Sequence, residues 1–326
     1  MPAANPNVSN FGSLEKMRAI KYPMIPWTNV NGILNCTGGF INFFGFNCEM
    51  NSLNFGTAGI PLSTPNRTTE NGIKQIKILG LTAMELEFVQ NVNISLEKAP
   101  IVKKIAEENN VTLTCHGQYF INLNAIEEHK QKASIARIVK AAVVADACGA
   151  YSMCFHPGFY LGKPAHETYD LVKQNLIKAV NEVRSQGAEI WVRPEVTGKH
   201  SQFGSVDELF KLSSELEGVL PCIDFSHVHA RANGKMNTYS EFCEVLEKLE
   251  KNCGKTALKN LHCHVQGVNY SEKGERNHLI FSESDFNYQD LMKAFFDFKC
   301  EGVIICESPN LETDALTLQK TYSKLK

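Results

Sequence analysis

The sequence contains no Cys-x-x-Cys pair, although it has 11 cysteines. An odd number of cysteines without paired spacing argues against a disulfide framework. Buried thiols scattered through strands are instead typical of a reducing compartment, so we expect a cytoplasmic protein. Five of the cysteines lie within short apolar runs: Cys115, Cys154, Cys222, Cys263 and Cys306.

The sequence also has no long hydrophobic run and no strong excess of one charge. The most apolar early stretch, residues 32–48, is too short for a transmembrane helix and is interrupted by Asn and Gly. It lies far from the N-terminus without a basic flank, so it does not predict a signal peptide. The net charge of −2 gives no general attraction to nucleic acid, but a local basic patch or bound cations can supply one.

Several common catalytic motifs are absent as well. No P-loop, GxGxxG or nucleophile elbow stands in a supporting strand–helix context. Instead, six short apolar runs each end in a residue type that binds metals, at intervals of roughly 30 to 45 residues, which is about the length of a strand, a helix and two loops. The six residues are His116, His156, Glu195, Asp224, His262 and Glu307.

This repeat predicts an α/β fold of the (β/α)8 TIM-barrel type, in which the C-terminal strand ends converge on one face. An open doubly wound sheet is less compatible, because it places its site at one switch point served by fewer strands. Residues 51–326 are predicted to form the barrel and residues 1–50 an irregular N-terminal extension of unknown role. The predicted strands are 53–60, 83–89, 112–116, 152–156, 189–195, 220–226, 260–265 and 303–307, and the predicted helices are 69–80, 97–110, 125–149, 166–187, 206–217, 239–251, 287–299 and 312–324.

The residue types at these strand ends suit a metal centre. Neutral imidazole is a preferred zinc ligand, and a carboxylate can bridge two ions. Glu195 follows Arg193 on the same face of its strand, which indicates either a buried ion pair or an arginine that supports the metal ligands. His262 and His264 alternate on one strand face, and at most one of them need bind metal directly. Two or three bridged cations would suit phosphoryl transfer.

The ordered motifs LTCHGQYFINL, FHPG, PEVTGKHSQFG, CIDFSHVHA and CESP resemble the endonuclease IV family of apurinic/apyrimidinic endonucleases, within the xylose-isomerase-like barrel superfamily. The resemblance covers roughly residues 53–326. It implies a trinuclear zinc centre that hydrolyses the DNA phosphodiester 5′ to an abasic nucleotide. By position, the first zinc would take His116, His156 and Glu195. The second would take Glu195, Asp224, His262 and Glu307, with Glu195 bridging and catalytic.

The resemblance also implies a third zinc and a DNA-facing surface. His227 matches a ligand of the third zinc, and Tyr119 matches a tyrosine that holds the DNA open beside the lesion. The family's Asp-Arg-His motif is replaced by Glu275-Arg276-Asn277-His278. Asn277 is a poor zinc ligand, so Glu275 with His278, His229 or His264 would have to complete the site. Residues 267–285 are predicted to form a long polar loop, in which Lys273 and Arg276 are expected to contact DNA.

The sequence therefore predicts a zinc-dependent endonuclease of base excision repair, with two or three Zn²⁺ ions and Mn²⁺ as the other candidate. Damaged double-stranded DNA is the expected partner, no membrane is involved, and the chain is expected to be monomeric. The alternative is a single-metal sugar isomerase or epimerase of the same superfamily, which would need only Glu195, Asp224, His262 and Glu307. A barrel that binds a ligand without catalysis is a weaker third hypothesis.

Overall fold

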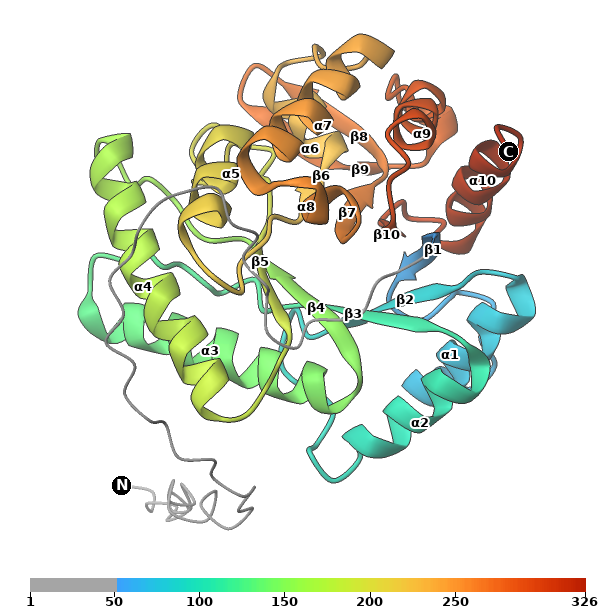
Figure 1. The fold of residues 1–326 in the computed structure, drawn as a ribbon, viewed down its shortest axis with the longest axis horizontal. Coiled ribbons are helices and arrows are strands. Elements are labelled where there is room, and N and C mark those ends of the chain that lie inside the picture. Colours follow the sequence, from blue (N-terminus) through green and yellow to red (C-terminus); the bar gives the residue numbers. More distant parts are fainter. Residues whose placement is uncertain (1–51) are drawn as a thin grey trace, which may run out of the picture. The chain divides into compact units, whose positions relative to one another are not determined.

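The computed structural model describes residues 52–326, and the predicted extension at residues 1–50 lies outside the described residues. Eight parallel strands form one curved sheet with the order β5-β4-β3-β2-β1-β10-β7-β6 (Figure 1). The strands are β1 (Leu53–Ala58), β2 (Ala83–Glu87), β3 (Thr112–His116), β4 (Ala150–Phe155), β5 (Trp191–Pro194), β6 (Ile223–Asp224), β7 (Leu261–Val265) and β10 (Gly302–Cys306).

Backbone hydrogen bonds join β5, at one end of this order, to the segment that leads into β6, at the other end. Val192 donates its N–H to Gly218 O (3.1 Å), and Cys222 donates to Pro194 O (3.0 Å). Isolated parallel bridges join Val192 to Val219 and Glu195 to Cys222. The sheet therefore curls round to meet itself, and the predicted TIM-barrel fold is confirmed.

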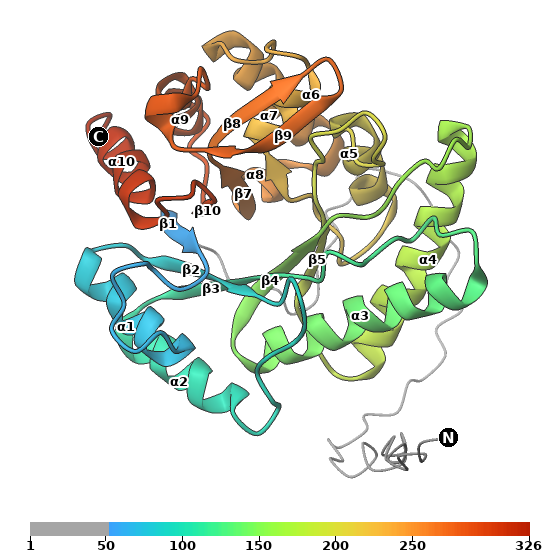
Figure 2. The same cartoon turned by 180° about the vertical axis from the view of Figure 1, so that it is seen from behind.

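Helices cover the outside of the sheet (Figures 1 and 2). On α4, buried Val172, Leu176, Ala179 and Val183 recur at spacings of three and four, which turns one face of the helix toward the sheet. The helices are α1 (Thr69–Leu79), α2 (Ala99–Asn109), α3 (Glu128–Ala147), α4 (Ala165–Ser185), α5 (Val206–Glu215), α6 (Phe225–Arg231), α7 (Tyr239–Cys253), α8 (Lys255–Leu258), α9 (Tyr288–Asp297) and α10 (Glu312–Ser323). Within residues 52–326, none of them is both long and apolar enough to cross a membrane.

Two of the predicted elements were wrong in part. The predicted strand 220–226 ends at Asp224, because the Asp224 carboxylate accepts a hydrogen bond from the His227 N–H (2.6 Å) and caps α6. The predicted polar loop 267–285 contains an antiparallel hairpin of β8 (Gly267–Ser271) and β9 (Gly274–Leu279), followed by a short 3₁₀ helix (Phe281–Glu283). Both differences affect segments that contribute to the metal centre.

The inside of the barrel is unusually polar. Barrel interiors are normally filled by bulky branched apolar side chains, but here only Ala83, Val303 and Ile305 form a small separate apolar cluster. The main hydrophobic core lies outside, between sheet and helices. The buried polar and thiol side chains of the inner strand faces are Glu85, Thr114, Ser152, Cys154, Arg193, Cys222, His262 and His264.

Arg193 does not pair with Glu195, so the buried ion pair, the first of the two alternatives for this strand, was wrong. Its side chain is 1% exposed and points to the N-terminal end of the barrel. Its guanidinium donates to Pro221 O (3.1 Å), Asn260 O (2.8 Å) and Asn260 Oδ1 (3.0 Å). Arg193 thus joins the chain segments that precede β6 and β7, and Glu195 is left free for the opposite end.

We expect Arg193→Met to lower the free energy of unfolding by about 3 kcal/mol, because buried acceptors that lose their donor cost about 1–3 kcal/mol each. Denaturant unfolding measures the change. Lys140→Met, at an exposed position on α3, is the matched control. Equal stabilities of the two variants would show that the hydrogen bonds of Arg193 do not hold the barrel together.

Candidate metal centre

The C-terminal ends of the strands bring three groups of metal-binding side chains together. Within each group, the candidate ligand atoms lie within 4.8 Å of one another. The strand ends, helix α6 and the β8–β9 hairpin supply side chains that are far apart in the sequence, as a barrel does. The groups are His116, His156 and Glu195; Glu195, Asp224, His264 and Glu307; and His227, Glu275 and His278.

Glu195 belongs to two of these groups, and its two oxygen atoms face different partners. Glu195 Oε2 lies 3.2 Å from Nε2 of both His116 and His156. Glu195 Oε1 lies 3.0 Å from His264 Nδ1 and 3.7 Å from His227 Nδ1. A fully buried carboxylate with one oxygen in each group has the arrangement of a bridging ligand.

Three of the histidines are oriented by backbone carbonyls. The Nδ1 atoms of His116, His227 and His278 lie 2.7 Å, 2.9 Å and 3.3 Å from Gly117 O, Val196 O and Glu307 O, respectively. A carbonyl oxygen only accepts, so each Nδ1 carries a proton, and Nε2 is the nitrogen that would bind a metal ion once it is deprotonated. This second hydrogen bond is how proteins fix the tautomer of a metal-binding histidine.

His264, and not His262, joins Glu195, Asp224 and Glu307. Both histidines point into the barrel, because they are two residues apart on β7. His264 is nearer the C-terminal end of the strand and therefore reaches the centre. His262 lies one layer deeper, with its Nδ1 2.8 Å from Ser152 Oγ.

The third group depends on a bulge in the β8–β9 hairpin. Tyr270 pairs with Glu275 but Asn269 pairs with Asn277, so Arg276 is an extra residue on β9. In a regular strand Glu275 would share a face with Asn277, two residues on. The extra residue instead turns Glu275 and His278 toward the same side, where His227 Nε2 lies 3.7 Å from Glu275 Oε2.

Gly198 allows the hairpin to approach the centre. A β carbon at this position would lie 2.6 Å from Glu275 Cβ and 2.9 Å from His227 Cδ2, closer than side chains tolerate. The Gly198 carbonyl also accepts the Glu275 N–H (2.9 Å). The GKH sequence after Glu195 is thus part of the third group's geometry.

The charges at the centre call for cations. Burial alone would lower the pKa of His116, but its hydrogen bond to Glu195 and the charge of that carboxylate raise the pKa to about 10. Burial, together with the charges of Glu307 and Glu195, raises the pKa of Asp224 well above its usual value. A proton or a metal ion must therefore lie among these carboxylates, and the imidazole and carboxylate donors present fit zinc or a similar divalent ion.

Sequence reasoning missed two acidic residues on β2. Glu85 is fully buried inside the barrel, and Glu87 lies at the strand's C-terminal end. Burial, the charge of Glu85 and the charge of Glu307 raise the pKa of Glu87 to about 8, although His116 and His264 lower it in part. The available signal was the alternation of charge in AMELE, because strands of a parallel barrel are usually near-continuously apolar.

The remaining predicted residues lie outside the three groups. Tyr119 is 53% exposed, and its ring lies edge-on to His116 with a centroid distance of 5.6 Å. Lys273 and Arg276 are exposed on the hairpin. His229 is buried on α6 and contacts Lys235 O (2.9 Å) and Asp285 Oδ1 (3.2 Å), so it takes no part in the groups.

A family model described as a xylose isomerase-like TIM barrel matches residues 73–324. The chain belongs to this family. That agrees with the predicted superfamily.

Two curated relatives share sequence with the chain. An uncharacterized protein of Methanocaldococcus jannaschii is 44% identical over 271 residues, which cover 83% of this chain and 97% of the relative. A probable endonuclease 4 of Shouchella clausii is 23% identical over 198 residues, covering 59% of this chain and 64% of that protein.

The solved structures that share the fold include an endonuclease and an epimerase-like protein. Endonuclease IV from Thermus thermophilus has a TM-score of 0.65 at 19% identity, covering 83% of this chain and 100% of that chain. A D-tagatose 3-epimerase-like protein also has a TM-score of 0.65, at 17% identity, covering 82% and 97%.

We expect His278→Ala to lower the metal content by about one ion per chain, because His278 supplies one of only three protein ligands in its group. Asn277→Ala is the matched control on the same strand, and its metal content is expected to equal that of the wild type. Elemental analysis of the purified proteins makes the comparison. Metal loss in Asn277→Ala but not in His278→Ala would contradict the bulged arrangement of β9.

Proposed function

We propose that the protein is a metal-dependent endonuclease that hydrolyses the phosphodiester on the 5′ side of an abasic nucleotide in duplex DNA. The proposal rests on the arrangement of the metal centre, supported by the sequence relationship to a probable endonuclease 4 and the shared fold of endonuclease IV.

The observation that carries the proposal is the division of Glu195 between two groups of ligands. A single-metal isomerase needs one group, and Glu195, Asp224, His264 and Glu307 would be enough for it. This chain adds His116 and His156 on the other oxygen of Glu195, and a third group beside them. Adjoining groups of this kind suit a centre of two or three ions, as in phosphoesterases.

Each group of side chains has a defined task in such a reaction. Metal ions held here would supply Lewis-acid stabilisation of the attacking and leaving oxygens. Carbonyls fix the ring orientations of His116, His227 and His278 so that Nε2 is the nitrogen available to a metal ion, and little reorganisation of the rings would be needed on binding. Glu87, with a pKa of about 8 at the edge of the centre, can hold or release a proton near neutral pH.

The rim offers surfaces for DNA. Tyr119, Phe120 and Phe159 follow the strand ends that carry His116 and His156, and all three side chains are exposed. Aromatic rings in such positions stack on bases or fill the space left by a displaced nucleotide. Lys273 and Arg276 on the hairpin would contact phosphates and make binding dependent on salt.

The second candidate is a sugar epimerase. It is favoured by the similar fold of the D-tagatose 3-epimerase-like protein and by the group of Glu195, Asp224, His264 and Glu307, which would be complete without the other two. The epimerase assignment gives no role to His116, His156 and the bulged hairpin.

We expect Glu195→Gln to reduce activity by at least about 100-fold, the size of effect seen when one group that stabilises a transition state is removed. The metal content should also fall, because the amide removes negative charge from two groups at once. Glu107→Gln, exposed on α2, is the control. Full activity and full metal content in Glu195→Gln would overturn the bridging role.

The deciding assay incubates the purified full-length protein with a labelled duplex that contains one stable abasic analogue, with and without a chelator. We expect a nick on the 5′ side of the lesion that the chelator abolishes, because the ions hold the reacting phosphate. An intact duplex of the same sequence is the substrate control. If the duplex stays whole while the same preparation interconverts ketoses, the epimerase is the correct assignment.

A further inference from the structure

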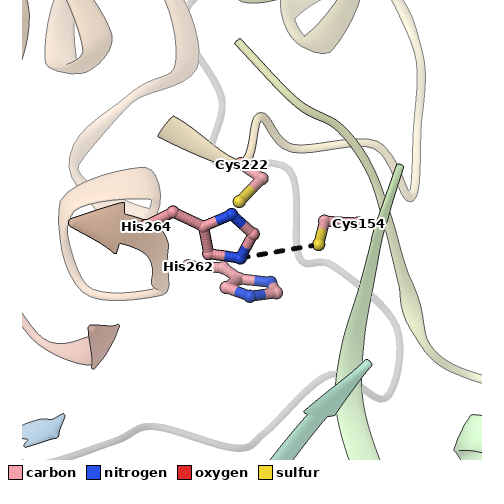
Figure 3. A group of neighbouring side chains, drawn as sticks. All are labelled: Cys154, Cys222, His262 and His264. Atoms are coloured by element: carbon pink, nitrogen blue, oxygen red, sulfur yellow. Dashed lines mark hydrogen bonds between the residues drawn. The ribbon is translucent and has the colours of Figure 1, made fainter. Parts of the chain in front are cut away.

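A fourth group of side chains lies inside the barrel, beneath the metal centre. Cys154 comes from β4, Cys222 from the residue before β6, and His262 and His264 from β7. All four are fully buried, and one candidate ligand atom of each lies within 4.8 Å of the others. Figure 3 shows the two thiols and the two imidazole rings gathered around one small volume.

Both imidazoles of this group also contact the buried Glu85 carboxylate on β2. His262 Nε2 lies 2.8 Å from Glu85 Oε2, and His264 Nε2 lies 2.9 Å from Glu85 Oε1. Even so, His262 Nε2 and Glu85 Oε1 make no aligned hydrogen bond with any described residue. The Glu85 carboxylate therefore forms ion-pair contacts with both rings and lies beside the group.

The orientation of His262 turns one of its ring nitrogens toward the group. Its Nδ1 lies 2.8 Å from Ser152 Oγ, a neighbour that occupies this ring nitrogen. The nitrogen left over, Nε2, is buried and faces the group. Its contact with Glu85 Oε2 is not an aligned hydrogen bond, so an ion or a hydrogen bond is still needed to satisfy this buried nitrogen.

We propose that Cys154, Cys222, His262 and His264 form a second metal site, which takes a Zn²⁺ ion. Two thiolates and two imidazoles are a typical tetrahedral zinc set, and four protein ligands leave no open position, so the ion would be structural. The donors differ from those of the centre above, where the three groups contain only imidazoles and carboxylates.

His264 connects the two sites. Its Nδ1 faces Glu195 Oε1 (3.0 Å), whereas its Nε2 lies 3.7 Å from Cys154 Sγ. With both sites filled, the ring would lose its remaining N–H proton to solvent and, as an imidazolate, would bind one ion through each nitrogen. The lower ion would then fix the position of a ligand of the upper centre and would join β4, β6 and β7 inside the barrel.

Zinc K-edge X-ray absorption of the purified wild-type protein tests the proposal without any substitution. We expect a sulfur shell at about 2.3 Å, the usual zinc–thiolate distance. The three groups of the upper centre contain no sulfur, so zinc bound only there would give nitrogen and oxygen neighbours alone. A spectrum without sulfur would overturn the second site.

Variants assign the sulfur to these two cysteines. The Cys154→Ser, Cys222→Ser double variant should lose the sulfur shell and about one zinc per chain. Cys263→Ser is the matched control, because Cys263 lies between the two histidines on β7 but packs in the outer core. A folded double variant that keeps both its sulfur shell and its zinc would refute the assignment.

The experiment is independent of the proposed endonuclease activity. A sulfur shell in a protein that nicks no abasic duplex would support the second site and reject the nuclease. Nicking by a protein whose zinc has no sulfur neighbours would do the opposite.

Discussion

The position of one buried carboxylate, Glu195, determines the arrangement of the metal centre. Its oxygens lie within 3.2 Å of His116, His156 and His264, which come from three other strand ends. This requires β5 to be in register with β4, and the Glu195 N–H donates to Phe155 O (2.9 Å). An ionised carboxylate at this depth is stable only when cations surround it. The register of the barrel strands therefore places these side chains around Glu195, and the same side chains offset the cost of burying its charge.

The polar interior has a consequence for stability. The large apolar cluster lies between the sheet and the helices, so the outer layer supplies most of the hydrophobic stabilisation. The inner strand faces therefore do not need the bulky apolar side chains that usually fill a barrel. They instead hold Glu85, Ser152 and His262, whose contacts with one another replace apolar packing. Because such a layer is stable only when every member is satisfied, it is also the layer where a bound ion would matter most.

Much of this arrangement was predictable from the sequence, for identifiable reasons. All eight strands were predicted because short apolar runs alternate with helical periods, and the ligand types stand where those runs end. Which of His262 and His264 reaches the candidate metal centre depends on how deep each lies in the barrel. The alternation of side chains along a strand does not reveal that depth. The pairing of Glu275 with His278 depends on one bulged residue, Arg276, that only the hairpin register shows. Glu85 and Glu87 are visible as charges in a buried strand, but their partners come from distant segments.

The same barrel can support one-metal and multi-metal chemistry, because the shared group occupies only part of the C-terminal face. Glu195, Asp224, His264 and Glu307 lie at the ends of β5, β6, β7 and β10. His116 and His156 follow β3 and β4, and the hairpin adds Glu275 and His278. Each addition uses a strand end or loop that supplies no other side chain to the one-metal group, although His116 and His156 share Glu195 with it. The side chains at the edge of the face therefore determine how many candidate metal groups it carries, while the barrel determines where those groups lie.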